Sequence, residues 1–461
     1  MNTVHDCFAS SAARTPQADF LFTEGVTARS YGIEPGVLSW GDAAARVEAL
    51  RRVYAAAGYG HGHRVGLLLE NRPAFLLHWF ALNALGASVV PMHAELRAAE
   101  LTYLVAHSEI VLAVTLPGRE ADLQHAAEAA GCALHTWVPE RGDAPPALRP
   151  PPRAGAAIGT STECALLYTS GTTGRPKGCI LSNAYYLDAG RWYVNLGHLC
   201  TVRRDAERVI TPLPLSHMNA MAFSTMVVLT AGGCLVQLDR FHPNTWWQSV
   251  RHSRATIVHY LGVMPAMLLA AAPSAEDREH AVRIGFGAGV DRKLHAVFEQ
   301  RFGFPLLEAW AMTETGSAAC VMAHREPRHV GTSCFGRADA AMQWRLVDDG
   351  GADVATGVPG ELLVRTAVGD PRRGFFSGYL KDEEATEEAW AGGWFHTGDV
   401  VRADADGNLY FVDRKKNVIR RSGENISAVE VESVLDTHPA VAASAVAATP
   451  DPTRGDEVLA C

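Results

Sequence analysis

Apolar runs alternate with helical patterns along the first third of the chain. Residues 64–70 and 86–91 are short apolar runs, and residues 74–85 between them are apolar over a length that favours a helix. A buried strand, a helix and a second buried strand in this order predict a βαβ unit with parallel strands and a right-handed crossover. The pattern continues with an expected helix over 98–108 and an expected strand over 110–115.

The same alternation continues through the middle of the chain. The expected strands lie at residues 165–168, 208–215, 232–237, 255–260 and 282–289. The expected helices lie at residues 183–196, 220–230, 242–251, 263–272 and 292–302. Strands that alternate with helices predict a mostly parallel sheet with helices on both faces.

The pattern changes near residue 331 to short strands separated by Gly and Pro turns, for example at 343–347 and 360–366. Such strands predict a small β-rich subdomain. Near the end of the sequence, residues 428–437 have a helical pattern and residues 441–447 resemble a strand. The last part of the chain therefore combines a helix with strands.

Together these elements predict the α/β fold class. We expect a large N-terminal domain of two mostly parallel, helix-flanked sheets and a small β-rich subdomain, followed by a hinge and an incomplete small α+β C-terminal domain. Residues 139–159, rich in Pro, Ala, Gly and Arg, are expected to form an exposed connector between the two sheets. The predicted boundaries are 1–413 for the N-terminal domain (about 1–150 for the first sheet, 160–330 for the second and 331–413 for the β-rich subdomain) and 414–461 for the hinge and the start of the C-terminal domain.

Composition narrows the class of protein. The chain of 461 residues is 48% apolar and 20% charged, which is typical of a soluble globular protein with two or three domains or subdomains. Its formal net charge of −9 argues against a nucleic-acid binder, which would carry a basic face. The nine cysteines form no Cys-x-x-Cys pair, which favours reduced thiols over disulfides or a zinc site. The sequence has no signal-peptide pattern and no apolar run of membrane-spanning length, so we expect a cytoplasmic protein without a membrane span.

The stretch from Tyr168 to Gly178 has the composition of a phosphate-binding loop. It reads Tyr-Thr-Ser-Gly-Thr-Thr-Gly-Arg-Pro-Lys-Gly and directly follows a buried strand. Its glycines let backbone N–H groups approach a ligand, its hydroxyls are donors, and Lys177 adds a positive charge. It lacks the Gly-Lys-Ser/Thr of a Walker A loop. On this stretch alone, both a polyphosphate-binding loop and a flexible turn with a solvated lysine remain open.

Further polar side chains stand at the ends of expected strands, where open α/β sheets bind ligands. Trp310, Thr313 and Glu314 follow one another closely at the end of a strand. The glycine-broken strand 282–289 lets a flat group lie against its backbone. His217 stands at a strand-to-helix corner.

With these stretches in this order, the sequence resembles the adenylate-forming ligases, a family that includes acyl-CoA synthetases, firefly luciferases and peptide-synthetase adenylation domains. The similarity covers nearly the whole chain and is most specific at residues 168–178, 310–314, 394–399 and 413–432. The sequence is most similar to free-standing ligases of the carnitine- and crotonobetaine-CoA type, because of the segments Asp413-Arg-Lys-Lys416 and Ser422-Gly-Glu-Asn-Ile426.

The resemblance implies an ATP-dependent, AMP-forming acyl-CoA ligase that uses a small-molecule carboxylic acid, ATP, Mg²⁺ and coenzyme A. The carboxylate attacks the α-phosphorus of ATP and releases pyrophosphate, and a thiol then displaces AMP from the acyl-adenylate. This chemistry needs the phosphate charge neutralised and the carboxylate aligned, so positioning and electrostatics dominate it.

The resemblance also implies roles for individual residues. Lys177 would bind the β- and γ-phosphates, Thr313 would contact the α-phosphate, and Glu314 would ligate Mg²⁺. The loop residues that share the phosphate role are Thr169, Ser170, Gly171, Thr172, Thr173 and Gly174. Trp310 would stack on the adenine, and Gly287, Ala288 and Gly289 would border it. Asp399 would accept hydrogen bonds from both ribose hydroxyls, and Arg414 would reach the ribose or a phosphate. Lys416 would be the hinge of the C-terminal domain, and Gly423 would lie beside the pantetheine arm of coenzyme A.

The acid pocket is implied by resemblance only, and its expected lining is His217, Asn219, Phe223, Gly285, Phe286, Ala309 and Ala318. His217 would gate this pocket, and a histidine that caps a corner fits the sequence equally well. The alternatives for Trp310 and Asp399 are a core tryptophan and a turn-capping aspartate.

Three features depart from the family pattern. Ala311 replaces the glycine of the aromatic-Gly-x-Thr-Glu motif, and Gly289-Val290 stands where many relatives have Ala-Pro. Relatives also carry a catalytic lysine beyond the position where this sequence stops, so we expect a truncated sequence.

Two alternatives to a complete ligase remain open. In the first alternative, the protein performs only one half-reaction. It either adenylates an acid for a carrier protein or an amine, or it forms a thioester from an adenylate made by a partner enzyme. In the second alternative, the protein is catalytically weak and binds a nucleotide or an acyl-adenylate.

Overall fold

The computed structural model describes residues 1–148, 157–169, 175–415, 419–421, 424–426 and 444–461, and positions 431, 434, 435, 438 and 441. The chain folds into two compact units. Unit 1 holds residues 1–167, 178–195 and 201–256, and unit 2 holds residues 168–177, 196–200 and 257–461. The helix expected over 428–437 lies largely outside the described residues.

The first sheet of unit 1 contains the predicted βαβ unit. Its strands are β3 (Arg64–Leu68), β4 (Ser88–Pro91), β5 (Leu112–Thr115), β6 (His135–Trp137), β7 (Glu163–Thr169) and β8 (Lys177–Ser182), in the order β6-β5-β3-β4-β7-β8. β3 pairs in parallel with both β4 and β5, and the pairs β4–β7 and β5–β6 are also parallel.

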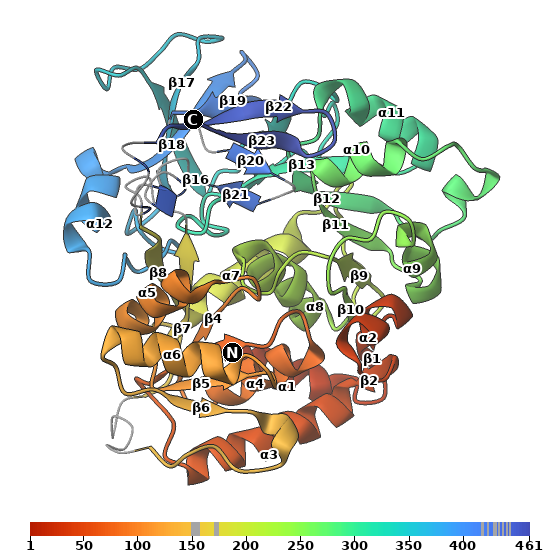
Figure 1. Ribbon diagram of the computed structural model, residues 1–461. Helices are drawn as coiled ribbons and strands as arrows, with labels where there is room; N and C mark the ends of the chain where they lie inside the picture. Colours follow the sequence, from red (N-terminus) through yellow and green to blue (C-terminus); the bar gives the residue numbers. More distant parts are fainter. Residues whose placement is uncertain are drawn as a thin grey trace. The chain divides into compact units, whose positions relative to one another are not determined.

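Helices flank this sheet, as predicted for an α/β fold. They include α1 (Val4–Arg14), α3 (Trp40–Ala56), α4 (Pro73–Asn83), α5 (Ala98–Ser108) and α6 (Glu120–Ala130), followed by the short 3₁₀ turn η1 (Pro139–Arg141). α4 packs with α1 and α3, whereas α5 packs with α6 (Figure 1). Right-handed crossovers that run in opposite directions from β3 place these two groups on opposite faces of the sheet.

Unit 1 also contains four strands of a second sheet. They are β1 (Asp19–Thr23), β2 (Gly36–Ser39), β9 (Arg208–Thr211) and β10 (Cys234–Gln237). β1, β10 and β9 pair in parallel, and β2 is the antiparallel edge. The remaining helices of unit 1 are α2 (Gly25–Tyr31), α7 (Asn183–Asn195), α8 (Met226–Ala231) and α9 (Trp246–Ser253).

The sheets are interleaved in sequence, which differs from the predicted division into residues 1–150 and 160–330. β1 and β2 lie in one sheet with β9 and β10, whereas β7 follows residue 160 and pairs with β4 of the other sheet. Hydrophobic periodicity indicates where strands and helices alternate, but it does not indicate which strands pair. The local pattern therefore could not show that strands from the two predicted regions share sheets.

Helix α4 illustrates how the local sequence fixes an element. Pro73 occupies the first turn, where a missing N–H costs nothing, and every residue from Phe75 to Asn83 is buried. Apolar residues on all sides of the helix match this burial, because α4 has no face toward solvent.

The helix expected over 220–230 is divided into two parts. Residues Asn219–Thr225 form the π-helix η2, and only the α8 segment that follows is α-helical. The Thr225 hydroxyl donates to the Ala220 carbonyl at 2.8 Å, and the Ser224 hydroxyl lies 3.4 Å from the Asn219 carbonyl. Each hydroxyl thus reaches a carbonyl five residues back, which is the spacing of a π-helix.

Unit 2 begins with three parallel strands and an antiparallel edge. The strands are β11 (Ile257–Leu261), β12 (Ile284–Ala288), β13 (Leu306–Trp310) and β14 (Val321–Met322). The helical segments here are α10 (Val263–Leu269), the 3₁₀ turn η3 (Ala275–Arg278) and α11 (Arg292–Phe302). The bounds of α11 are those predicted from the sequence, and it buries His295, Phe298 and Phe302 on one face.

Two antiparallel sheets complete unit 2. The predicted β-rich subdomain contains β15 (Cys334–Gly336), β16 (Met342–Val347), β17 (Gly360–Thr366), β18 (Phe395–Ala403) and β19 (Leu409–Arg414), with α12 (Glu383–Ala389) and the 3₁₀ turn η4 (Ala391–Gly393). Its strand order is β15-β19-β18-β17-β16, with antiparallel pairs throughout. The last sheet contains β20 (Ile419–Arg421), β21 (Glu424–Ile426), β22 (Val446–Asp451) and β23 (Gly455–Ala460). The predicted α/β fold class with a β-rich subdomain is confirmed.

The described part of the chain contains neither a membrane-spanning helix nor a disulfide bond. None of its helices combines the length and the apolar character that crossing a bilayer requires. All nine cysteines are free thiols, seven of them buried.

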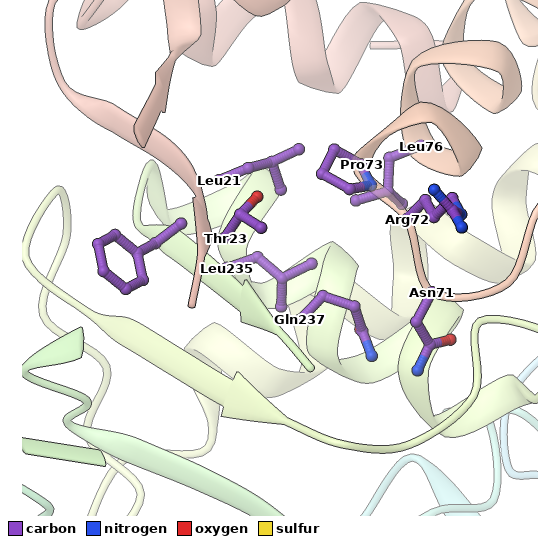
Figure 2. A pocket seen from close by; sticks show the side chains of 9 residues that line it. Leu21, Thr23, Asn71, Arg72, Pro73, Leu76, Leu235 and Gln237 are labelled. Atoms are coloured by element: carbon purple, nitrogen blue, oxygen red, sulfur yellow. The ribbon is translucent and has the colours of Figure 1, made fainter. Parts of the chain in front are cut away.

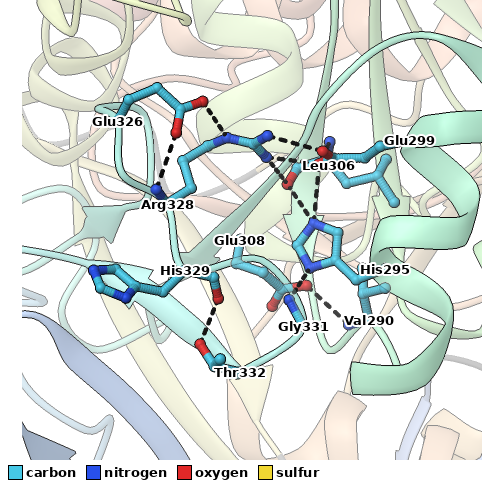
Figure 3. A network of polar contacts seen from close by, with 10 residues as sticks. All are labelled: Val290, His295, Glu299, Leu306, Glu308, Glu326, Arg328, His329, Gly331 and Thr332. Carbon is cyan, nitrogen blue, oxygen red and sulfur yellow. Dashed lines mark hydrogen bonds and ion pairs between the residues drawn. The ribbon is translucent and has the colours of Figure 1, made fainter.

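A half-buried ionic network stabilises the end of α11 and the start of β13 in unit 2 (Figure 3). Arg328 donates to both carboxylate oxygens of Glu299, at 2.6 and 2.8 Å. The same carboxylate accepts the Leu306 N–H at 2.8 Å and lies 3.1 Å from His295 Nε2. Burial alone would raise the pKa of Glu299, but the hydrogen bonds from Arg328 and His295 outweigh burial and lower the pKa to about 2.

We expect Glu299→Gln to destabilise unit 2 by about 1.5–3 kcal/mol near neutral pH, because the half-buried Arg328 guanidinium loses one of its two carboxylate partners and keeps only Glu326. A carboxyl whose pKa is lowered in the folded state contributes stability above its unfolded pKa and loses it as the pH falls toward the folded pKa. The difference in unfolding free energy between wild type and Glu299→Gln should therefore shrink as the pH falls below about 4.5 toward 2.

Urea denaturation at several pH values measures this difference. Glu384→Gln on the exposed side of α12 is the matched control and should change little at any pH. A Glu299→Gln effect that stays constant down to about pH 3 would contradict the assignment of the lowered pKa to Glu299.

Candidate functional site

Unit 2 gathers Thr169, Lys177, Glu314, Tyr379 and Asp382, which we call the lysine cluster. Thr169 ends β7, Lys177 begins β8, and Glu314 follows β13. Glu314 is only 7% exposed, and its Oε1 accepts the Tyr379 hydroxyl at 3.0 Å and lies 3.5 Å from the Thr169 hydroxyl. The predicted residues Thr169, Lys177 and Glu314 therefore do come together.

Lys177 is held beside this carboxylate by an aromatic ring. Its Nζ lies 4.8 Å from the centre of the Tyr379 ring and 3.9 Å from Asp382 Oδ2. Tyr379 thus contacts the cation with its ring face and the Glu314 anion with its hydroxyl. The arrangement concentrates one positive charge and two hydroxyl donors next to a buried carboxylate.

Tyr379 is a residue that the sequence did not single out. It is 65 residues from Glu314 along the chain, and no local pattern links the two. The one available signal was its position after Gly378, whose φ of +139° favours glycine and turns the chain just before the tyrosine.

Trp310, Asp399 and Arg414 form a second group in unit 2, which we call the Asp399 cluster. Asp399 lies in β18 opposite Arg414 of β19, and its Oδ1 is 3.1 Å from Arg414 Nε. The Trp310 indole N–H donates to Asp399 Oδ2 at 2.8 Å. Asp399 is only 2% exposed, and its Oδ1 accepts no hydrogen bond from the residues that the structure describes. Such a buried carboxylate oxygen can still accept a hydroxyl from a ligand.

The backbone after β12 is fixed by another buried carboxylate, which the sequence did not single out. Glu308 is 6% exposed and accepts the Gly289 N–H at 3.0 Å and the Val290 N–H at 2.9 Å. Gly289 has a φ of +78°, a backbone angle that favours glycine. Glu308 therefore determines the path of the segment that contains the predicted Gly287, Ala288 and Gly289.

The glycines of β12 face a protein side chain. A Cβ at Gly287 would lie 2.2 Å from the Tyr260 carbonyl oxygen and 2.7 Å from the Tyr260 ring. A Cβ at Gly285 would lie 2.7 Å from a Leu306 methyl group and 3.2 Å from the same ring. Tyr260 thus occupies the side of β12 toward which a side chain at Gly285 or Gly287 would point, and the ligand roles of these glycines stay predictions.

The other residues expected around the acid lie in both units. In unit 1, His217 is exposed with its ring centre 6.0 Å from that of His93, Asn219 begins η2, and Phe223 is buried against Trp192. In unit 2, Phe286 is buried against His259, whereas Ala309 and Ala318 are half-buried. Thr313, which was predicted to contact the α-phosphate, is half-buried as well. Their roles stay predictions.

Several predicted site residues lie outside the described residues. These are Ser170, Gly171, Thr172, Thr173 and Gly174 of the glycine-rich loop, the hinge residue Lys416, and Gly423.

A pocket in unit 1 is lined by none of the predicted site residues (Figure 2). It encloses about 220 Å³, part of it open to solvent, between β1, β10 and the start of α4. Its lining is Leu21, Phe22, Thr23, Asn71, Arg72, Pro73, Leu76, Leu235 and Gln237.

The described residues contain no group of three or more His, Cys, Asp or Glu side chains that would hold a metal ion by themselves. Glu314 is the predicted metal ligand, and a hard cation bound there would take its remaining ligands from a phosphate and water, as Mg²⁺ commonly does. The carboxylate and its neighbouring hydroxyls fit such an ion.

The chain has extensive similarity to known proteins. The sequence profile of the family described as "AMP-binding enzyme" matches residues 8–380. Crotonobetaine/carnitine–CoA ligase of Escherichia coli O45:K1 (strain S88 / ExPEC) is 30% identical over 428 residues, which cover 88% of this chain and 80% of that protein. The ligase of the same name from Salmonella paratyphi A is 29% identical over 431 residues, with the same coverage.

Solved structures confirm the fold. A double mutant of o-succinylbenzoate CoA synthetase (MenE) from Bacillus subtilis has a TM-score of 0.82 and 22% identity, covering 100% of this chain and 88% of that chain. ATP-bound MatB from Rhodopseudomonas palustris has a TM-score of 0.75 and 24% identity with the same coverage.

We expect Glu308→Ala to loosen the segment after β12, because the Gly289 and Val290 amides lose their acceptor. Hydrogen bonds to charged groups contribute about 1.5–3 kcal/mol, so amide exchange at these two positions should become about 10–100-fold faster. Hydrogen exchange with mass spectrometry measures this effect.

Asp348→Ala is the matched control, because Asp348 also accepts two amides, from Gly350 and Ala352, but in an exposed turn. It should leave exchange at 289 and 290 unchanged. Unchanged exchange at these positions in Glu308→Ala would show that Glu308 does not fix the segment.

Proposed function

Because the chain belongs to the family of AMP-binding enzymes, we propose that it joins a carboxylic acid to coenzyme A through an acyl-adenylate, with ATP as the energy source. Similarity to two CoA ligases over 88% of the chain supports this reaction class. The observation that carries the proposal is the lysine cluster, which presents a cation, a buried carboxylate and hydroxyl donors together in unit 2.

The reaction proceeds in two displacements. In the first, a carboxylate oxygen of the acid attacks the α-phosphorus of ATP, and the bond to pyrophosphate breaks. In the second, the CoA thiolate attacks the acyl carbon, and the carbon–oxygen bond to AMP breaks. The protein contributes mainly by neutralising charge and aligning the reactants.

Lys177 and the Thr169 hydroxyl bind the β- and γ-phosphates in this proposal, and Glu314 holds Mg²⁺. Bound there, Mg²⁺ neutralises phosphate charge. The Tyr379 hydroxyl fixes the orientation of the Glu314 carboxylate at 3.0 Å, and the Tyr379 ring keeps the Lys177 ammonium close to it. Thr313, which follows β13 one residue before Glu314, contacts the α-phosphate.

The adenosine is bound by the Asp399 cluster and the backbone after β12. Asp399 accepts the ribose hydroxyls, since a carboxylate offers two oxygens to a diol. Arg414 contacts the ribose or a phosphate, and Trp310 stands beside the adenine with Gly287, Ala288 and Gly289.

The acid is a small-molecule carboxylic acid, bound near His217. We also propose a cytoplasmic location, which agrees with nine free thiols. A partner enzyme that supplies or receives the acyl group is not needed when both displacements occur on this chain.

Product analysis tests the proposal. The protein is incubated with ATP, Mg²⁺ and a panel of carboxylic acids that includes crotonobetaine and carnitine, with and without CoA. Mass spectrometry should find an acyl-adenylate without CoA and an acyl-CoA with it. A thioester formed only from preformed adenylates would restrict the function to the second step, and adenylate binding without any product would reduce it to a binding protein.

We expect Lys177→Ala to slow adenylation about 100–1,000-fold, as the loss of one charged group that stabilises a transition state does. Binding of an acyl-adenylate should change much less, because that ligand lacks the β- and γ-phosphates. Exchange of labelled pyrophosphate into ATP measures the first effect, and calorimetric titration measures the second.

Lys293→Ala, an exposed lysine at the start of α11, is the matched control and should change neither quantity. Equal losses in both assays for Lys177→Ala would remove the phosphate role from Lys177.

We expect Asp399→Ala to weaken ATP and AMP to the same extent, about 10–100-fold, because both ligands carry the same ribose. Fluorescence or calorimetric titration gives the two affinities, and the exposed Asp406→Ala serves as control. An unchanged AMP affinity would refute the ribose assignment.

A further inference from the structure

The Trp310 indole makes a specific polar contact besides its packing. Its N–H donates to Asp399 Oδ2 at 2.8 Å, although Trp310 ends β13 and Asp399 lies in β18 of a different sheet. Both residues are buried, with 6% of Trp310 and 2% of Asp399 exposed. A hydrogen bond to a carboxylate in such surroundings is stronger than one between neutral groups.

Packing fixes the direction of this N–H. The Trp310 ring stacks on Phe335 of β15, with ring centres 6.1 Å apart and planes inclined by 30°. Because only 6% of Trp310 is exposed, little of the ring remains for another aromatic group to cover. The polar edge is therefore the part of Trp310 that acts most directly on the site.

Asp399 needs such a contact to bind both hydroxyls of a diol. Rotation of a carboxylate about its last side-chain bond is soft, so its two oxygens do not keep one orientation unaided. Trp310 holds Oδ2, and Arg414 stands 3.1 Å from Oδ1. Each carboxylate oxygen has two lone pairs, so both oxygens retain a position for a ligand hydroxyl.

We propose that Trp310 is a positioning residue for the ribose: its indole N–H sets the orientation in which Asp399 accepts the two ribose hydroxyls. This inference rests on the proposed nucleotide site and adds to it, because it gives Trp310 a role that passes through Asp399, separate from its place beside the adenine. Removing the N–H should weaken the recognition of the ribose hydroxyls and leave adenine contacts in place.

The test compares AMP with 2′,3′-dideoxy-AMP, which lacks both hydroxyls. Calorimetric titration gives the affinities of both ligands for wild type and for Trp310→Phe, which keeps an aromatic ring against Phe335 but has no N–H. Wild type should prefer AMP by about 100-fold, and Trp310→Phe should lower this preference about tenfold by weakening AMP alone.

Two further variants keep the test independent of folding. Replacement of Trp310 by 3-benzothienylalanine, which has the shape of tryptophan with sulfur in place of the N–H, should reproduce the Trp310→Phe result. Phe335→Leu removes the stacking partner but keeps the donor, and it should retain most of the preference for AMP.

The outcomes separate the inference from the proposed function. If Trp310→Phe and the sulfur analogue weaken AMP and 2′,3′-dideoxy-AMP equally, Trp310 acts by stacking or packing, and the positioning role is overturned while the nucleotide site stands. If wild type binds both ligands equally, Asp399 does not bind the ribose, and both the inference and the assignment of Asp399 fail.

Discussion

Buried carboxylates that must be hydrogen-bonded determine the organisation of unit 2. Glu308, Glu314 and Asp399 are 6%, 7% and 2% exposed, and an ionised carboxylate in such surroundings is destabilising unless donors surround it. Each therefore draws a specific partner from a distant part of the chain: the amides after β12 for Glu308, the Tyr379 hydroxyl for Glu314, and the Trp310 indole for Asp399. The same requirement that stabilises the fold thus fixes the groups that the proposed reaction uses.

These three carboxylates have distinct consequences for the chemistry. The pairing of Glu308 fixes backbone, that of Glu314 brings a lysine and two hydroxyls together, and that of Asp399 orients an acceptor. Glu299 is different, since its partners Arg328 and His295 belong to the network that ties α11 to β13 and none of them is a predicted site residue. A carboxylate withdrawn from solvent and surrounded by donors therefore does not by itself mark a functional residue, and the kind of donor that surrounds it has to be considered.

The sequence predicted what local physics determines. The helices over 98–108 and 292–302 have the predicted bounds, because apolar spacing and caps act within a few residues. Thr169, Lys177 and Glu314 were predicted from the composition of residues 168–178 together with the family resemblance, and the structure brings them together. Tyr379, Glu308 and Arg328 were missed because their roles arise from partners 65, 18 to 19 and 29 residues away, which no periodicity reports. The assignment of strands to sheets was wrong for the same reason. β1 and β10 pair with each other although most of the sequence of unit 1 lies between them.

The central claim is that a carboxylate oxygen of the acid attacks the α-phosphorus of ATP on this chain. Transfer of oxygen-18 tests it most directly. An acid labelled in both carboxylate oxygens is incubated with the protein, ATP, Mg²⁺ and CoA, and the nucleotide products are analysed by mass spectrometry. We expect AMP that carries one oxygen-18, because the thiolate later breaks the acyl carbon–oxygen bond and leaves the labelled oxygen on phosphorus. Label in inorganic phosphate together with ADP, or acyl-CoA formed with unlabelled AMP, would contradict it.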